Sequence, residues 1–345
     1  MKRTFQLIRI LELLIILFVV VVLAVSVGSA DLSMTDSLKI VLNKVPLIGD
    51  LIDISDIGTT YEIIVWKVRL PRIMLSALVG GTLAVVGVCF QGVFGNSLAD
   101  PHILGVSSGA ALGATLAMLF GTPVVLWGLG EVGVMAFAGA LITAFMVYNV
   151  AKIAGDISTT NMLLTGTATS TMLSAVISLL MTFNQEQIDK VYMWTMGSFT
   201  AATWEKVLFL LVFFSLGFAV LYGYSGKLNI LMMGDEDAKC LGIDTARIRR
   251  NNIIVSSLMV AAAVSVSGII GFVGLIIPHI IRIICGSDNK KLMVYSAIMG
   301  AAFLVLCDTA ARTLASPTEI PVGVITSILG APFFIFLVVT RKKKI

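Results

Sequence analysis

The residues of this chain that could carry catalytic chemistry are few and stand far apart in the sequence. There are two histidines, His102 and His279, and neither belongs to an HExxH or another metal-ligand spacing. The four cysteines form no CxxC pair and are interpreted as small apolar residues. No GxxxxGK[ST] sequence occurs, so the chain is predicted not to bind the phosphates of a nucleotide. A membrane-embedded enzyme, which needs clustered His, Asp or Glu, is therefore disfavoured.

One acid and one base stand together near the end of an uncharged stretch. Asp308 and Arg312 are four residues apart, a spacing that permits an ion pair on one face of a helix. An ion-coupled secondary transporter usually needs more acids inside its spans. The sequence shows no such set, so this alternative is disfavoured, and the energy for any transport is expected to come from elsewhere.

The elements that must position these residues are membrane-spanning helices. Of 345 residues, 58% are hydrophobic and 13% are charged, whereas a soluble domain carries about 25% charged residues. A spanning helix needs about 17–25 apolar residues. The stretches without Asp, Glu, Lys or Arg that meet or approach this length are Leu13–Ala30, Ile73–Ala99, Ile103–Gly130, Val132–Ala151, Ile157–Gln185, Val207–Gly226, Asn251–Ile281, Leu292–Cys307 and Ile320–Thr340.

The stretch Asn251–Ile281 is too long for one helix. It contains Gly268, Gly271 and Pro278, which favour a break. Dividing it there gives ten spans. The sequence therefore predicts an all-α polytopic membrane protein with ten transmembrane helices and a single domain over residues 1–345, and it excludes a soluble enzyme and a nucleic-acid binder.

The basic residues indicate how these spans are oriented. With ten spans both termini lie on the same side, and 16 of the 24 Lys and Arg residues then fall on that side. Basic residues gather on the cytoplasmic side of membrane proteins, so both termini are expected to be cytoplasmic. The first span is too long for the apolar region of a cleaved signal peptide.

Small residues mark where helices are expected to pack. Gly80, Gly81 and Gly87 lie in the second span, and Gly105, Gly109 and Gly113 follow at four-residue intervals in the third. Close backbone approach holds helices together in lipid, so we interpret these residues as packing positions rather than a substrate path. The start of the fifth span, Ser158-Thr-Thr-Asn161, has more polar side chains than an N-cap needs. For that segment a cap and a water-lined passage remain equal alternatives.

Several of these residues belong to motifs that occur in order along the chain. The motifs are Arg69-Leu-Pro-Arg72, Gly80 to Gln91, Asn96 to Ala110, Trp194 to Phe199, Leu228 to Gly242, Gly268 to Arg282, Asp308 to Arg312, Glu319 to Gly323 and Gly330 to Phe334. In this pattern the sequence resembles the FecCD-like family, the permease subunits of ABC importers for iron–siderophores, haem and cobalamin. Ser97 departs from it, because the family usually has Pro there, and the outer segment Asp31–Glu62 looks longer than usual.

The resemblance implies a type II ABC importer fold and a set of partners. It implies a second permease copy, as a homodimer or close heterodimer with the path at the subunit interface, in a bacterial or archaeal cell membrane. Two cytoplasmic ATPase subunits would bind ATP and Mg, so no cofactor is expected in this chain. An extracytoplasmic binding protein would deliver the substrate. A ferric siderophore is the substrate we expect, because it is the broadest class in the family, with haem and cobalamin as alternatives.

The resemblance also assigns roles to individual residues. Arg69, Arg72 and Arg312 are expected to present guanidinium groups to carboxylates of the binding protein, with Pro71 starting the second helix. The cytoplasmic gate is expected at two loop-to-helix junctions, and the contact with the ATPase is expected in the inner loop. The gate residues are Asn96, Leu98, Thr159 and Thr160, and the coupling residues are Gly234, Asp235, Glu236, Ala238, Leu241 and Gly242.

Overall fold

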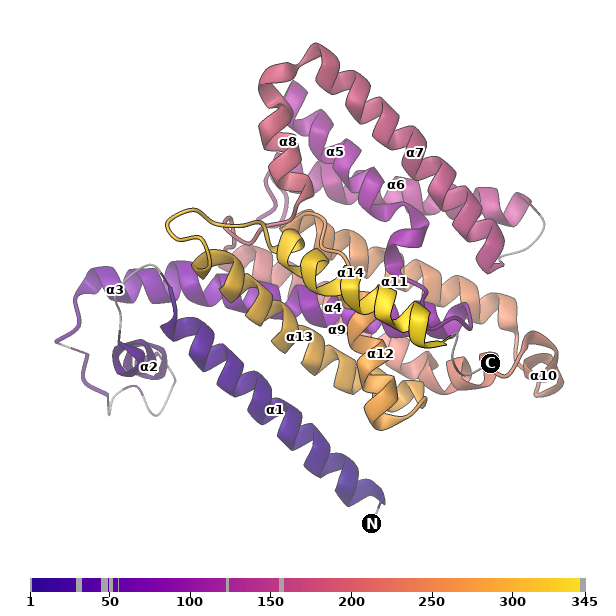
Figure 1. The fold of residues 1–345 in the computed structure, drawn as a ribbon, viewed down its shortest axis with the longest axis horizontal. Helices are drawn as coiled ribbons and strands as arrows, with labels where there is room; N and C mark the ends of the chain where they lie inside the picture. Colours follow the sequence, from indigo (N-terminus) through magenta and orange to yellow (C-terminus); the bar gives the residue numbers. More distant parts are fainter. Residues whose placement is uncertain are drawn as a thin grey trace.

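The chain folds as a bundle of helices (Figure 1). The structure is a computed structural model and describes residues 2–28, 33–44, 49, 52–54, 56–121, 124–154 and 158–341. Besides the short helices η2 (Ile64–Arg69), η3 (Pro101–Leu104) and η4 (Gln185–Gln187), the helices are α1 Lys2–Ser26, α2 Met34–Asn43, α3 Thr59–Ile63, α4 Leu70–Val93, α5 Val106–Phe120, α6 Glu131–Ile153, α7 Thr159–Phe183, α8 Ile188–Thr195, α9 Trp204–Leu231, α10 Asp235–Cys240, α11 Thr245–Ser267, α12 Val273–Cys285, α13 Asn289–Thr313 and α14 Val322–Arg341.

Ten of these helices correspond to the ten predicted spans. Among the described residues, 7 helices are long and apolar enough to cross a membrane, and α5, α12 and α14 contain shorter apolar helical stretches. The predicted break of the long stretch 251–281 is confirmed. There α11 ends at Ser267, Gly268 and Phe272 have φ of 70° and 68°, and α12 begins at Val273.

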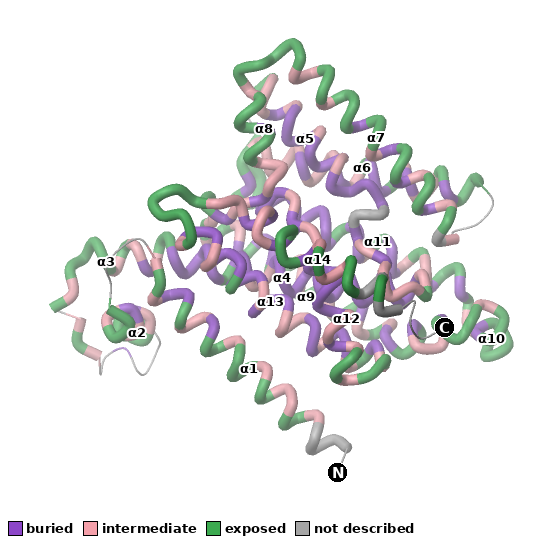
Figure 2. The backbone as a smooth tube through the Cα atoms, in the orientation of Figure 1, coloured by how far each residue is buried: buried purple, intermediate pink, exposed green. Residues whose placement is uncertain are grey.

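The helix α4 lies at the centre of the bundle. It packs against α9, α11, α12 and α13, and most of its residues are buried (Figure 2). Glycines permit this closeness. A Cβ on Gly80 would lie 2.2 Å from the carbonyl oxygen of Gly300 in α13, and one on Gly87 would lie 1.8 Å from that of Gly274 in α12. The packing interpretation of these glycines is therefore confirmed.

The start of the second span differs from the prediction. We expected Pro71 to begin it, but helical turns run from Thr59 through η2 into α4, and residues 59–93 form one apolar helical segment. The helix η2 is a π-helix, in which the N–H of Leu70 bonds to the carbonyl of Val65, five residues back. A proline cannot donate to an α-turn and crowds the preceding turn, and the π-turn lies directly before Pro71.

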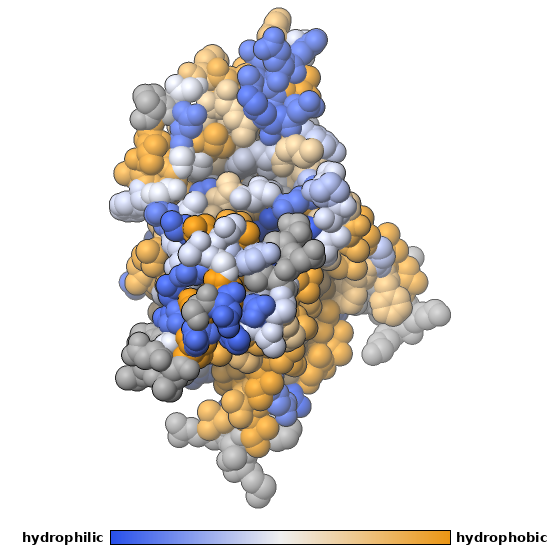
Figure 3. All heavy atoms as spheres, turned by 90° about the vertical axis from the view of Figure 1, so that its left-hand side faces the viewer, coloured by the Kyte–Doolittle hydropathy of each residue, from blue (hydrophilic) through white to orange (hydrophobic). Residues whose placement is uncertain are grey.

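The two ends of the bundle carry different segments. The helices α2 and α3 and the loop between α13 and α14 lie toward one end, on the left in Figure 1, whereas α10 and the ends of α1 and α14 nearest the termini lie toward the other. Figure 3 looks onto the first end, where hydrophilic side chains gather while hydrophobic ones cover the flanks. We call these the α2–α3 end and the α10 end. The basic residues Lys342–Lys344 lie outside the described part of the chain.

Candidate functional site

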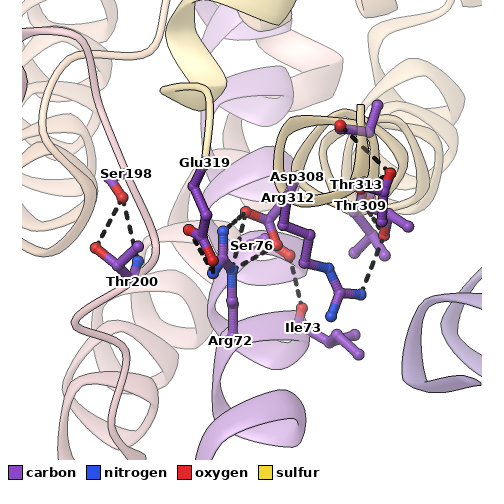
Figure 4. Close-up of polar contacts among 12 residues, drawn as sticks. Arg72, Ile73, Ser76, Ser198, Thr200, Asp308, Thr309, Arg312, Thr313 and Glu319 are labelled. Carbon is purple, nitrogen blue, oxygen red and sulfur yellow. Dashed lines mark hydrogen bonds and ion pairs between the residues drawn. The ribbon is translucent and has the colours of Figure 1, made fainter. Parts of the chain in front are cut away.

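A buried ion-pair cluster joins α4, α13 and the loop between α13 and α14 at the α2–α3 end (Figure 4). Arg72 of α4 donates from Nε and Nη2 to Asp308 of α13, with distances of 2.9–3.1 Å. Its Nη1 donates to both carboxylate oxygens of Glu319, at 3.0 and 2.9 Å. The Asp308 side chain is 1% exposed, whereas that of Glu319 is 39% exposed. Arg72 thus holds one buried and one half-exposed carboxylate.

The other two arginines of this end hold the last turn of α1. Arg69 donates to the carbonyl of Val25 at 2.8 Å, and Arg312 donates to that of Ala24. The last carbonyls of a helix have no intrahelical partner, and the C-terminal end of its dipole favours cations. Two guanidinium groups from η2 and α13 therefore cap α1 and tie it to the bundle.

These contacts bear on two expectations from the sequence. Asp308 pairs with Arg72 rather than with Arg312. The three arginines are buried in the single chain, at 4%, 8% and 8% exposure for Arg69, Arg72 and Arg312, and their expected role in docking a binding protein stays a prediction. The accessible member of the cluster is Glu319, whose role the sequence did not single out although its motif was matched.

Glu319 also lines a hollow of about 680 Å³ at the α2–α3 end. The hollow lies among the ends of α5, α6, α8, α9 and α11, and Lys190, Lys206 and Trp194 are among the residues that line it. Lys206 donates from Nζ to the carbonyl of Ala201 at 2.7 Å. Acidic and basic side chains thus share one open cavity beside the ion-pair cluster.

The helix α7 has three distinct faces. Met162, Gly166, Thr169 and Leu173 form the buried face. At 100° per residue, the opposite face carries exposed hydroxyl groups together with Leu164. The exposed apolar side chains of Met172, Leu179 and Phe183 lie to one side of it. The exposed hydroxyl residues are Thr160, Thr167, Thr171, Ser174, Ser178 and Thr182.

Four of these hydroxyl groups, those of Thr167, Thr171, Ser178 and Thr182, donate to backbone carbonyls within the helix. Thr171 donates to the carbonyl of Thr167 at 2.9 Å, and Ser178 donates to that of Ser174 at 3.0 Å. Their oxygens remain available to accept hydrogen bonds from water. The sequence pointed only to the polar start of α7, where Ser158 is confirmed as an N-cap that accepts from the N–H of Asn161.

The two halves of the expected gate lie on neighbouring elements. The loop after α4 is closed by Asn96, whose Oδ1 accepts from the N–H of Leu98 at 3.0 Å, so the turn forms with Ser97 in place of Pro. The loop leads into η3, which contacts α7. Thr160 is exposed in the first turn of α7, and the side chain of Thr159 lies outside the described part. The gate itself stays a prediction.

The expected coupling segment forms a short exposed helix at the α10 end. Gly234 precedes α10 with φ of 128°, and Gly242 follows it with φ of 75°, conformations that favour glycine. Asp235 and Glu236 lie in the first turn, and Asp235 pairs with Arg249 of α11 at 2.7 Å. Leu228, where the matched motif begins, belongs to the last turns of α9. Ala238 is buried and Leu241 is exposed.

The histidines and cysteines form no metal-binding group in the described residues. No group of three or more His, Cys, Asp or Glu side chains there could hold a metal ion. The ring of His279 packs edge-on against Phe333, with centroids 6.3 Å apart. Cys89 and Cys307 are buried, but Cys240 is exposed at the end of α10, so its interpretation as an apolar filler is wrong.

Comparison with known proteins agrees with this arrangement. Residues 15–340 match the FecCD transport family. The cobalamin import system permease protein BtuC of Halobacterium salinarum is 43% identical over 325 residues, covering 93% of this chain and 86% of that protein. The hemin transport system permease protein HmuU of Yersinia pestis is 37% identical over 288 residues, covering 81% and 84%.

A solved structure described as an inward-facing conformation of a metal-chelate type ABC transporter has a TM-score of 0.79 at 33% identity, covering 96% of this chain and 98% of that chain. The fold is therefore that of a type II ABC importer permease in a prokaryotic cell membrane. ATP hydrolysis belongs to a separate subunit, and no cofactor is expected in this one. The chain is a member of the FecCD transport family.

Proposed function

We propose that this permease imports a large metal chelate along a passage lined by the hydroxyl face of α7. The observation that carries the proposal is the row of exposed hydroxyl groups on the side of α7 opposite its buried face. Hydrocarbon tails offer such oxygens no hydrogen-bond donors, whereas water does. A spanning helix with this face is therefore expected to border a water-filled cavity.

A second copy of the chain completes the cavity. One subunit leaves the hydroxyl face of α7 open, and α7 lies at the edge of the bundle (Figures 1 and 2). A homodimer with a two-fold axis beside α7 would place two such faces against each other and enclose the passage. The gate residues Asn96, Leu98, Thr159 and Thr160 would then close it at the α10 end.

The remaining partners would bind at the two ends. We place the α10 end in the cytoplasm, with both termini, because the ten-span assignment puts 16 of the 24 Lys and Arg residues on the side of the termini. Two ATPase subunits would contact α10 through Gly234, Asp235, Glu236, Ala238, Leu241 and Gly242. A binding protein would dock at the α2–α3 end. Because Arg72 is buried and already donates to both Asp308 and Glu319, a carboxylate of the binding protein would reach it only by displacing Glu319.

The two relatives described above support a chelate but differ over which one. The 43% identical relative is named for cobalamin and the 37% identical one for hemin. The ferric siderophore expected from the sequence shares with these two a metal enclosed in a large organic ligand. Cobalamin is the first candidate on identity, and a ferric siderophore and haem follow.

Uptake by the assembled complex tests the function. The permease, reconstituted in vesicles with its ATPase and binding protein, should import one of the three chelates when ATP is supplied. Titration of the isolated binding protein with each chelate should identify the same compound by nanomolar to micromolar binding. ATP-independent uptake driven by a proton or sodium gradient would refute the ATP-driven importer.

Crosslinking tests the passage separately. In a variant with Cys240→Ser, Thr171→Cys should crosslink between the two copies, because the residue faces the partner. Leu179→Cys is a matched control, since this residue is also exposed but lies on the apolar side of α7. Crosslinking of Leu179→Cys in preference to Thr171→Cys would place the dimer interface on another face.

A further inference from the structure

One amide side chain at the α10 end bonds to two residues of a distant turn. Asn229 lies near the end of α9 and donates from Nδ2 to Oδ1 of Asp288, at 2.9 Å. Its Oδ1 accepts from the backbone N–H of Asn289, at 2.8 Å. Asp288 is the N-cap of α13 and accepts from the N–H of Lys290. Asn229 therefore fastens the end of α9 to the turn between α12 and α13.

The same junction reaches α4. Asn289 is fully buried, and its Nδ2 donates to the sulfur of Met232 at 3.3 Å. A Cβ on Gly92 in the last turn of α4 would lie 3.5 Å from Leu228 and 3.6 Å from Nδ2 of Asn289. The ends of α9 and α4 and the start of α13 thus meet around one buried asparagine.

This junction lies between α10 and the loop of the expected gate, the two parts that would move in the proposed importer. From Asn229 the chain runs through Met232 and Gly234 directly into α10. From Gly92 it runs into the loop of the expected gate, where the N–H of Asn96 bonds to the carbonyl of Gln91. A displacement of α10 would therefore reach the gate loop through packed side chains and the hydrogen bonds of Asn229, Asn289 and Asn96.

We propose that Asn229 is a positioning residue that couples α10 to the gate loop. The inference rests on the proposed function, because it needs α10 to receive the ATPase. An amide suits the place because it donates to Asp288 and accepts from the N–H of Asn289 at the same time. Packed contacts alone do not prove a pathway. The proposal therefore requires that a change in this junction alters the amount of ATP hydrolysed per chelate imported.

The experiment measures ATP hydrolysed per chelate imported, in vesicles that contain the full complex. Asn229→Ala removes both hydrogen bonds without adding a charge, and this ratio should rise about fivefold or more. Asn229→Asp places a second carboxylate beside Asp288 and should uncouple the complex further. Adding Asp288→Asn to Asn229→Asp restores a donor facing an acceptor, and the ratio should return to near the wild-type value.

Asn251→Ala is the matched control. Asn251 is also an amide near the α10 end, and its Nδ2 donates to the hydroxyl of Tyr224 at 2.8 Å, so it links α11 to α9 without touching the junction. Its removal should leave the ratio unchanged. An equal rise in Asn229→Ala and Asn251→Ala would mean general loosening of this end and overturn the proposal.

Two further results would overturn the proposal. One is that Asn229→Ala hydrolyses as much ATP per imported chelate as the wild type. The other is that the exchanged pair, the double variant Asn229→Asp with Asp288→Asn, assembles but stays uncoupled. If Asn229→Ala does not assemble, the exchanged pair decides alone. Failure of the proposed function is distinguishable, because the wild-type complex would then import none of the three chelates and the variants would not be compared.

Discussion

The ion-pair cluster at the α2–α3 end predicts that two carboxylates on the same arginine contribute very differently to stability. Asp308→Asn removes the charge of the side chain that is 1% exposed and accepts from Nε and Nη2 of Arg72. Glu319→Gln removes the charge of the side chain that is 39% exposed. Both substitutions keep the size of the side chain, so the difference between them isolates burial.

The expected magnitudes follow from solvent access. Breaking one half of a buried ion pair costs about 3–5 kcal/mol, because the remaining charge stays away from water. A pair that is open to solvent contributes about 0.2–1 kcal/mol. The difference of about 3 kcal/mol corresponds to about a hundredfold in the ratio of folded to unfolded protein.

Unfolding by sodium dodecyl sulfate in mixed micelles measures this difference at one temperature, where unfolding is reversible. Glu62→Gln is the control, because Glu62 pairs with Lys44 at the same end and is 31% exposed. It should resemble Glu319→Gln. Equal losses in Asp308→Asn and Glu319→Gln, or a loss below about 0.5 kcal/mol in Asp308→Asn, would refute the argument from burial.

Other positions give predictions of the same kind. Leu98→Ala should widen the expected gate and raise leak of chelate without ATP; unchanged leak would place the constriction elsewhere. Gly234→Val and Gly242→Val should each leave the permease folded but lower transport, since a β-branched residue held at positive φ strains the backbone by about 1–3 kcal/mol. Normal transport in both variants would remove the coupling assignment. Gly87→Val should prevent folding, because its Cβ would lie 1.8 Å from a backbone oxygen, whereas Gly223→Val, with open space, should express normally.

The span pattern was predictable because it depends on local composition. Stretches without charge and the glycines near Gly268 were enough to give ten helices and the break between α11 and α12. The ends of helices were less predictable. Arg9 and Glu12 lie inside α1, and Arg69 lies inside a continuous helix, because long charged side chains near a bilayer surface are tolerated within a helix.

The environment of the charged residues was the least predictable part. Spacing made Asp308 and Arg312 an obvious pair, but Asp308 bonds to Arg72, which is 236 residues away. Such a choice depends on which faces of α4 and α13 meet, and that follows from Gly80 and Gly300 rather than from the charges. For the same reason the sequence did not predict a role for Asn229, because its partners Asp288 and Asn289 lie about 60 residues away along the chain.

The π-helix η2 has a consequence for how this protein could change. A π-turn holds one residue more than an α-turn. Deleting one residue between Ile64 and Val68 would restore a regular α-helix. Because the π-turn spreads about the same rotation over one more residue, α3 would keep nearly its present direction relative to α4, and α4 would keep its glycine contacts. The helix η2 thus lets descendants of this chain gain or lose a single residue before α4 without turning α3 or repacking the bundle.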